Sequence, residues 1–254
     1  MNFFEPLSII AFGLAFGSFV TCMSYRLPLE MDLVKKTSYC PSCNAVLGFK
    51  DLWPLFSWLF SRGKCRHCKI PVSIRYPLTE IATAFLFLLV YFQFGFTLPT
   101  LVLCLMVVAL MIMIVVDLEH YIIPDSVHVA LIPLALLYHY LVGSPWEEVA
   151  IGFATMLGLG LFLHYGYSAI RGRVMLGFGD VKFFAVAGLW LGIWPLVPFL
   201  FISGVLGVVL GLIWRLLGRG EVFPFGPALA LSLFVCVVYQ SDVNLLYYIG
   251  NIAN

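Results

Sequence analysis

Long apolar runs recur along almost the whole chain and limit the folds that it can adopt. A transmembrane helix needs about 20 apolar residues. Runs of about this length occupy Pro6–Tyr25, Pro77–Gly95, Leu98–Val116, Ser126–Val142, Val149–Ile170, Val181–Trp194, Pro195–Leu217 and Phe223–Tyr239. Charged residues make up only 11% of the chain, against about 25% in soluble domains. The sequence therefore predicts an all-α polytopic membrane protein with about eight transmembrane helices.

One long polar stretch interrupts these runs and sets the domain organisation. The first run lacks the basic start and small-residue cleavage site of a signal peptide, which predicts a retained helix. We expect a first transmembrane helix at 1–26, a small cytoplasmic loop domain at 27–76 and a larger transmembrane domain at 77–254.

The Lys and Arg residues predict how the chain is oriented. With eight spans, all 14 of them fall on one side of the membrane, and the positive-inside rule places that side in the cytoplasm. They are Arg26, Lys35, Lys36, Lys50, Arg62, Lys64, Arg66, Lys69, Arg75, Arg171, Arg173, Lys182, Arg215 and Arg219. The opposite side holds Glu5, Glu147, Glu148 and Asp242. Both termini are then expected outside, and a net charge of +1 gives no indication of nucleic-acid binding.

Four cysteines in the polar stretch form two C-x-x-C pairs. Cys40 and Cys43 make the first pair, and Cys65 and Cys68 make the second. Two such pairs supply four thiolates, the ligand set of a structural zinc site. A redox pair or unpaired thiols are the alternatives, and His67 is more simply a neighbour than a ligand. Because so short a polar stretch has little core, a bound metal would hold it folded.

Two aspartates stand at predicted membrane edges and are the candidate catalytic residues. Asp117 ends the third run, and Asp180 precedes the sixth. Placing an ionised acid near the hydrocarbon core costs free energy, so acids at such positions usually have a function. If the two lie close together, one stays protonated, so the pair can serve as general acid and general base without a metal. The structural alternatives are a helix N-cap for Asp180 and a headgroup position for Asp117, although an acid opposes the dipole at a helix C-terminus.

Several other residues are candidates for supporting roles. Gly177 and Gly179 would let the backbone approach a substrate closely and turn into the next helix. Asp125 follows a proline and precedes an apolar run, so helix capping explains it well. Glu80 lies one turn into the second run, where it could pair with a basic group or face a polar cavity.

A set of short motifs follows the chain nearly from end to end. The motifs are Phe16-Gly17-Ser18-Phe19, Tyr25-Arg26-Leu27-Pro28, the two cysteine pairs, Arg75-Tyr76-Pro77-Leu78-Thr79-Glu80, Asp117 with Ile123-Pro124-Asp125, Gly177-Phe178-Gly179-Asp180-Val181-Lys182 and Pro224-Phe225-Gly226-Pro227. Each motif is weak alone, whereas their order along the chain is highly specific. In this order they resemble the motifs of the bacterial type IV prepilin peptidases.

The resemblance implies a bifunctional membrane enzyme of the bacterial inner membrane, with an aspartic peptidase in the 77–254 domain. Asp117 and Asp180 match the catalytic acids, with Lys182 and Asp125 in the same motifs. The implied substrate is a prepilin or pseudopilin of a pilus or secretion system. Its basic leader would be cut off at the cytoplasmic membrane edge, and the new N-terminus methylated from S-adenosylmethionine.

The cysteine stretch bears on the second activity, because family members without it act as peptidases alone. The sequence has no glycine-rich nucleotide loop, so Glu80 and Gly17 are our candidates for the methyl-donor site. Two other functions fit the same residues. An ion-coupled transporter also needs acids in its spans, and a zinc-bearing scaffold for pilus or secretion assembly would need no catalysis.

Overall fold

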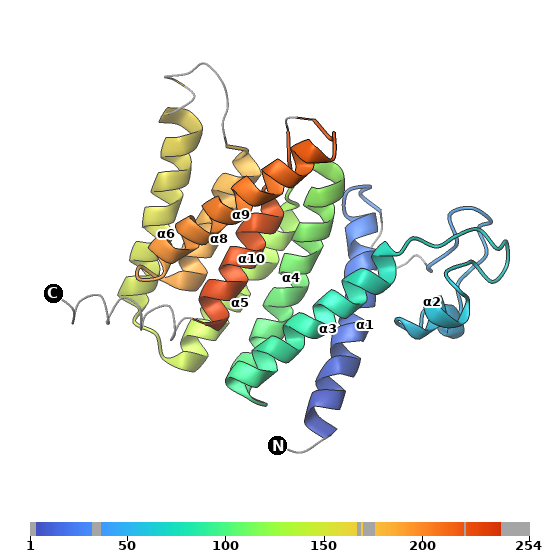
Figure 1. The fold of residues 1–254 in the computed structure, drawn as a ribbon. Coiled ribbons are helices and arrows are strands. Elements are labelled where there is room, and N and C mark those ends of the chain that lie inside the picture. Colours follow the sequence, from blue (N-terminus) through green and yellow to red (C-terminus); the bar gives the residue numbers. More distant parts are fainter. Residues whose placement is uncertain (1–3, 32–36, 167–168, 170–175, 221, 240–254) are drawn as a thin grey trace. The chain divides into compact units, whose positions relative to one another are not determined.

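The computed structural model describes residues 4–31, 37–166, 169, 176–220 and 222–239. Lys35, Lys36, Arg171, Arg173 and Asp242, which entered the charge argument, lie outside these ranges. The chain divides into two compact units, Met1–Thr100 and Leu101–Asn254. The domain boundaries predicted at residues 26 and 76 stay predictions. Apart from two isolated β-bridges, the regular structure of the described residues is helical (Figure 1).

Two long antiparallel helices, α1 (Phe4–Arg26) and α3 (Arg75–Phe94), build the first unit. Glycines let them approach closely, because a Cβ on Gly13 or Gly17 would lie only 2.5 Å from the Cα of Ala84 or Glu80. At the far end of the pair, the Tyr91 hydroxyl donates to Glu5 Oε2 over 2.6 Å. These contacts fix the register of α1 against α3.

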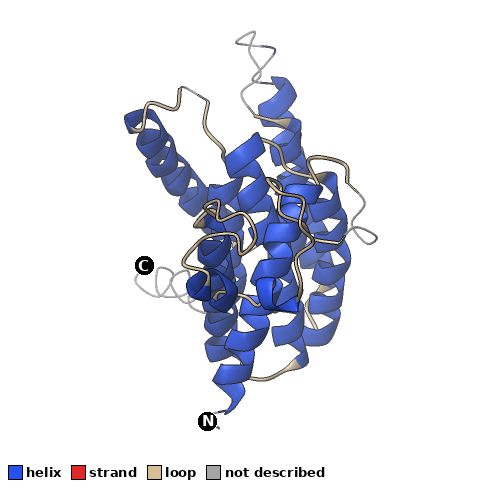
Figure 2. Ribbon diagram, turned by 90° about the vertical axis from the view of Figure 1, so that its right-hand side faces the viewer, coloured by secondary structure: helices blue, strands red, loops and turns tan. Residues whose placement is uncertain are grey.

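The polar stretch between α1 and α3 contains little regular structure. It holds a 3₁₀ turn, η1 (Phe49–Asp51), and the short helix α2 (Phe56–Phe60). The bridges pair Tyr39 with Val46 and Lys64 with Pro71. Most of the stretch is drawn as loop in Figure 2. A segment this short cannot bury much apolar surface, so local turns and side-chain links hold it together.

Six helices make up most of the second unit. They are α4 (Leu98–His120, whose first residues belong to the first unit), α5 (Asp125–Val142), α6 (Trp146–Leu161, continued by the π-helical turn η2, Phe162–Gly166), α8 (Phe178–Leu191), α9 (Leu196–Leu216) and α10 (Gly226–Val238).

Helix α8 is the central helix of the second unit, because α5, α6 and α10 all pack against it. Gly188 of α8 meets Gly152 of α6 so closely that a Cβ on Gly188 would lie 2.3 Å from the Gly152 carbonyl oxygen. The Trp190 indole donates to the Leu131 carbonyl of α5 over 3.1 Å. The helix is therefore held on several sides, and its first turn has a defined position.

The expected membrane-protein class is confirmed. By length and composition, six described helices could cross a membrane: α1, α3, α4, α5, α6 with η2, and α9. The other two predicted runs also hold helices, but α8 has 14 residues and α10 has 13. At 1.5 Å per residue each is about 20 Å long, whereas the hydrocarbon core is about 30 Å thick. Both helices are largely buried within the unit, and by length alone they fall short of a full span.

Candidate active site and cysteine centre

Asp117 lies in the last turn of α4, where its carboxylate is buried with 5% of the residue exposed. Its Oδ2 atom accepts a hydrogen bond from the backbone N–H of Gly226, 2.7 Å away. Gly226 is the first residue of α10, so its N–H is one of the donors that a helix start leaves without an intrahelical partner. The positive end of α10 therefore faces a carboxylate that the negative end of α4 would disfavour.

Asp180 lies in the first turn of α8. The helix begins at Phe178 with Gly177 as its N-cap, so Asp180 is not the N-cap that the sequence alternative proposed. Its carboxylate instead lies against Gly177, where a Cβ would be 3.1 Å from Asp180 Oδ2. Asp180 is thus the third residue of the helix, where an acid also interacts favourably with the helix dipole.

The second unit brings these two acids together. The Asp117 and Asp180 carboxyl groups lie within range of a direct electrostatic interaction, although 63 positions separate them in the sequence. The site is formed by the end of α4 and the starts of α8 and α10, and α8 packs against α10. Two carboxyl groups within electrostatic reach form an arrangement that can share one proton.

Asp125 and Lys182 lie beside this pair and link α5 to α8. Lys182 Nζ donates to Asp125 Oδ1 over 2.6 Å. Pro124 is the N-cap of α5 and no side chain caps that helix, so the interpretation of Asp125 as a capping residue was wrong. A Cβ on Gly179 would lie 3.4 Å from the Ile123 side chain, so the Gly-Phe-Gly-Asp turn also packs on the segment before α5.

The two cysteine pairs in the first unit fold into the same local structure twice. In each, the residue before the first cysteine bridges to the residue six positions after that cysteine. The first cysteine of each pair accepts from the N–H four positions on, where Asn44 and Lys69 have φ of 56° and 63°. Such repeated turns direct two thiols each toward a common centre.

The four sulfur atoms form a compact group. All lie within 4.8 Å of one another, and the Sγ atoms of Cys40 and Cys68 are 3.9 Å apart. In a tetrahedral zinc site with Zn–S bonds of about 2.3 Å, sulfurs are about 3.8 Å apart. Backbone N–H groups of Ser42 and Cys43 lower the pKa of Cys40 to about 6, and those of Cys68 and His67 lower the pKa of Cys65. Although the Ala45 backbone lowers it, burial and the hydrogen bonds with Cys40 and Cys68 raise the pKa of Cys43 to about 11. The fit to a metal ion therefore rests on the spacing of the four sulfur atoms.

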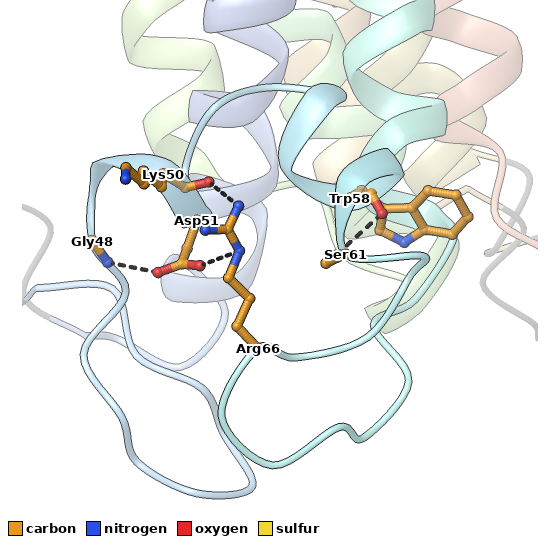
Figure 3. Close-up of polar contacts among 6 residues, drawn as sticks. All are labelled: Gly48, Lys50, Asp51, Trp58, Ser61 and Arg66. Atoms are coloured by element: carbon orange, nitrogen blue, oxygen red, sulfur yellow. Dashed lines mark hydrogen bonds and ion pairs between the residues drawn. The ribbon is translucent and has the colours of Figure 1, made fainter.

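Arg66 ties the two cysteine loops together, as Figure 3 shows. Its Nε lies 3.2 Å from Asp51 Oδ1 and its Nη2 donates to the Lys50 carbonyl over 3.1 Å. Asp51 Oδ2 also accepts from the Gly48 N–H at 3.1 Å. The guanidinium therefore links the second cysteine pair to the turn that follows the first.

The two candidate methyl-donor residues have different surroundings. Glu80 is 5% exposed, and its Oε2 accepts from the Leu55 N–H over 2.6 Å. Gly17 packs directly on the backbone of Glu80. A side chain at 17 would push α3 away, so Gly17 acts through packing, whereas Glu80 directs a carboxylate toward the polar stretch.

The comparisons with known proteins agree with this layout. The family model for the bacterial peptidase A24 N-terminal domain matches residues 11–94, and the model for the type IV leader peptidase family matches residues 101–212. A protein of Neisseria gonorrhoeae named prepilin leader peptidase/N-methyltransferase is 32% identical over 95% of this chain and 92% of its own. The chain belongs to the type IV leader peptidase family.

Relatives with the same name cover the chain equally well. The Legionella pneumophila protein is 32% identical over 97% of this chain and 95% of its own, and the Bacillus subtilis protein is 31% identical over 95% and 97%. No solved structure gives a significant match. The two family models meet near the division between the compact units at Thr100 and Leu101, so each unit corresponds to one of them.

Sequence reasoning missed two backbone groups at the candidate sites. Gly226, which donates to Asp117, was noted only within a motif near the C-terminus, and Leu55, which donates to Glu80, was not noted at all. A glycine between two hydrophobic stretches was the only available signal for the first. Leu55 has a positive φ of 59°, and a leucine in the sequence gives no indication of that backbone conformation.

Proposed function

We propose that this member of the type IV leader peptidase family cleaves the leader from prepilins or pseudopilins and then N-methylates the new terminus. The observation that carries the peptidase half is the meeting of Asp117 and Asp180 within electrostatic reach at three helix ends. The names of the relatives support both halves, since each is called prepilin leader peptidase/N-methyltransferase.

The dyad would work as a shared-proton aspartic site. The ionised carboxylate takes a proton from water, and the resulting hydroxide attacks the scissile carbonyl carbon. The protonated carboxyl gives its proton to the carbonyl oxygen, which forms a gem-diol. Collapse of the gem-diol breaks the C–N bond, and a proton passes to the leaving amine. The Gly226 N–H would hold Asp117 in position throughout.

The neighbouring residues would position the dyad. The Lys182–Asp125 pair links α8 to α5, so it restrains the turn that carries Asp180. Gly177 and Gly179 keep that turn narrow, which would allow an extended peptide to approach the carboxylates. We assign all four residues supporting roles and no proton transfer.

Cys40, Cys43, Cys65 and Cys68 would hold one zinc ion. Bound in a closed four-thiolate site, zinc would supply structural stability and no catalysis. The ion would fold the polar stretch, where the methyl donor S-adenosylmethionine is expected to bind.

The orientation follows from charge. The Lys and Arg distribution favours a cytoplasmic position for the polar stretch and for Asp117, Asp125 and Asp180, with both termini on the outer side of the inner membrane. A substrate with a basic leader and a hydrophobic helix would present its scissile bond at the same edge. The expected partners are such substrates and membrane lipid, without nucleic acid.

Intact mass spectrometry of the purified protein with a leader-bearing prepilin and S-adenosylmethionine tests the proposal. Wild type should release the leader and add about 14 Da, one methyl group replacing a proton. Asp117→Asn and Asp180→Asn should each lower the cleavage rate by at least about 100-fold, as loss of a general acid or base does. Cleavage at the wild-type rate by either folded variant would refute the dyad.

A further inference from the structure

The first unit contains a cavity of about 240 Å³ that the proposed peptidase chemistry does not use. The second half of α1, the start of α3 and the cysteine stretch form its walls, and its lining includes Tyr25, Arg26, Asp51, Trp58, Arg66 and Glu80. Small-molecule sites typically measure about 300–1,000 Å³. This cavity lies just below that range, so it suits one small-molecule ligand and is too small for a peptide helix.

Glu80 places a buried carboxyl group in one wall of the cavity. Its carboxylate accepts from the Leu55 N–H and the Ser18 hydroxyl. Among the described residues no cation pairs with it, although it is 95% buried (5% exposed). A carboxyl group out of water binds a proton unless a nearby cation compensates the charge of its ionised form. The cavity therefore favours a ligand that brings a positive charge to Glu80.

The rest of the lining offers binding groups of other kinds. Arg26, Lys64 and Arg66 are cationic, and Arg66 is held in place by Asp51. Tyr25, Trp58 and Tyr76 add aromatic rings, and the Trp58 indole is fixed by donating to the Val72 carbonyl over 3.1 Å. Fixed aromatic faces bind planar bases by stacking and bind cations through the ring quadrupole.

We infer that this cavity binds S-adenosylmethionine, with Glu80 facing the sulfonium. The inference rests on the proposed methyl transfer and gives it a location. The ligand combines a planar base, a sulfonium cation and an amino-acid carboxylate, and the lining carries aromatic rings, an uncompensated carboxylate and basic side chains for them. Cys40 and Cys65 also line the cavity, so a zinc ion at the cysteines would stabilise one of its walls.

The transfer balances without any further reagent. The cleaved substrate's α-ammonium first gives a proton to water, and its nitrogen lone pair then attacks the methyl carbon. The N–C bond forms as the C–S bond breaks, and the C–S electron pair remains on sulfur. The products are neutral S-adenosylhomocysteine and a methylated ammonium. The positive charge thus moves from sulfur to nitrogen, and Glu80 can stabilise it in both positions.

The test uses two ligands that differ in charge. S-adenosylmethionine and S-adenosylhomocysteine are titrated calorimetrically into the full-length protein in detergent, as wild type and as Glu80→Gln. Glutamine keeps an acceptor for the Leu55 N–H, so the variant removes mainly the charge. We expect binding of S-adenosylmethionine to weaken about tenfold or more, because a charge-assisted contact is lost, and binding of S-adenosylhomocysteine to change less than about threefold.

The matched control is Glu5→Gln, which alters another α1–α3 carboxylate contact outside the cavity, that with the Tyr91 hydroxyl. It should leave both affinities within about twofold of wild type. Equal affinities of Glu80→Gln and wild type for S-adenosylmethionine would overturn the assignment, as would equal losses for both ligands. If Glu80→Gln fails to fold, the test uses Ser57→Phe, whose larger side chain fills the cavity from α2. This variant should lose binding of both ligands, and unchanged binding would overturn the assignment of the cavity.

Leader cleavage and methylation of the substrate are recorded for the same preparations. Wild type that binds S-adenosylmethionine through Glu80 but never methylates a cleaved substrate would contradict the proposed function and support the cavity as a binding site. Alternatively, wild type could methylate the substrate while Glu80→Gln and Ser57→Phe both bind the donor normally. That result would contradict the assignment of the cavity as the donor site and would support the proposed function. The two failures are therefore distinguishable.

Discussion

At the residue scale, the contact between Gly226 and Asp117 leaves the least room for an added side-chain atom in the candidate active site. The Gly226 N–H donates to the buried carboxylate, and a Cβ added at 226 would lie 2.7 Å from the same oxygen. Only a residue without a side chain allows the backbone of α10 this close to Asp117. The glycine is needed for space, because the helical backbone conformation at this position does not itself require glycine.

We therefore expect Gly226→Ala to disturb the peptidase site more than the fold. The methyl group must displace the Asp117 carboxylate or the start of α10, and misplacing a catalytic group by about 1 Å costs about 100-fold in rate. Leader cleavage, followed by mass spectrometry, measures the loss. Gly204→Ala in α9, where a Cβ would meet nothing within 4 Å, is the control and should cleave normally. Normal cleavage by Gly226→Ala would contradict the assignment of Asp117.

Asp125 provides a contrast among the acids at the site. Its side chain is 73% exposed and paired with Lys182, and exposed ion pairs contribute about 0–1 kcal/mol. We predict that Asp125→Asn lowers the cleavage rate by less than about tenfold, whereas Asp180→Asn lowers it by at least about 100-fold. Initial cleavage rates at saturating substrate decide the question. Equal losses would mean that Asp125 takes part in the chemistry.

At the element scale, glycines set the distances between helices. Gly17 lets α1 contact the backbone of α3 at Glu80, and Gly188 and Gly152 let α8 and α6 touch. These contacts fix the position of α8, and with it the turn that carries Asp180. A change that weakens the contact between Gly188 and Gly152 should therefore also alter the geometry of the candidate active site.

Gly188→Ala should destabilise the protein although alanine is the better helix former. The added Cβ would lie 2.3 Å from the Gly152 carbonyl oxygen, and overpacking costs about 1–3 kcal/mol, which exceeds the gain of about 1 kcal/mol from helix propensity. Thermal unfolding in detergent should show a lower midpoint. Gly158→Ala on α6, where the Cβ would enter open space, should match or exceed the wild-type midpoint. A midpoint for Gly188→Ala equal to that of Gly158→Ala would contradict this packing argument.

At the scale of the whole molecule, the two proposed activities belong to different compact units. The dyad lies in Leu101–Asn254, whereas the cysteines and the cavity lie in Met1–Thr100. The two family models divide the chain near the same point. Damage to the first unit should therefore affect methylation more than cleavage.

Cys40→Ser tests this separation. Loss of one thiolate should lower the zinc content of the purified protein, and the loosened cavity wall should reduce methylation by at least about tenfold, as loss of a supporting metal contact does. Cleavage should fall less than about threefold. Elemental analysis and intact mass give the three values from one preparation, with Cys104→Ser, a buried α4 thiol outside the cluster, as the control. Equal loss of both activities would mean that the cysteine centre supports the entire fold.

The amino-acid sequence by itself determined the membrane class, the positions of the eight apolar helices, the cysteine pairing into one cluster and the family. These features depend on composition, short spacing and motif order, which are local and therefore readable from residue types. The length of α8 was less readable. Its apolar run continues into Trp194, but the α-helix ends at Leu191, and Gly192 has φ of 65°.

Only the tertiary structure decided which groups meet. It placed the Gly226 N–H on Asp117, the Asp125 carboxylate on Lys182 instead of a helix cap, and Gly17 behind Glu80 rather than facing a ligand. It also enclosed Glu80 in a cavity with Trp58 and Arg26. Such contacts join residues tens of positions apart through the crossing of helices. A hydrophobic run specifies that a helix forms, but the close approach of particular backbones specifies what that helix faces.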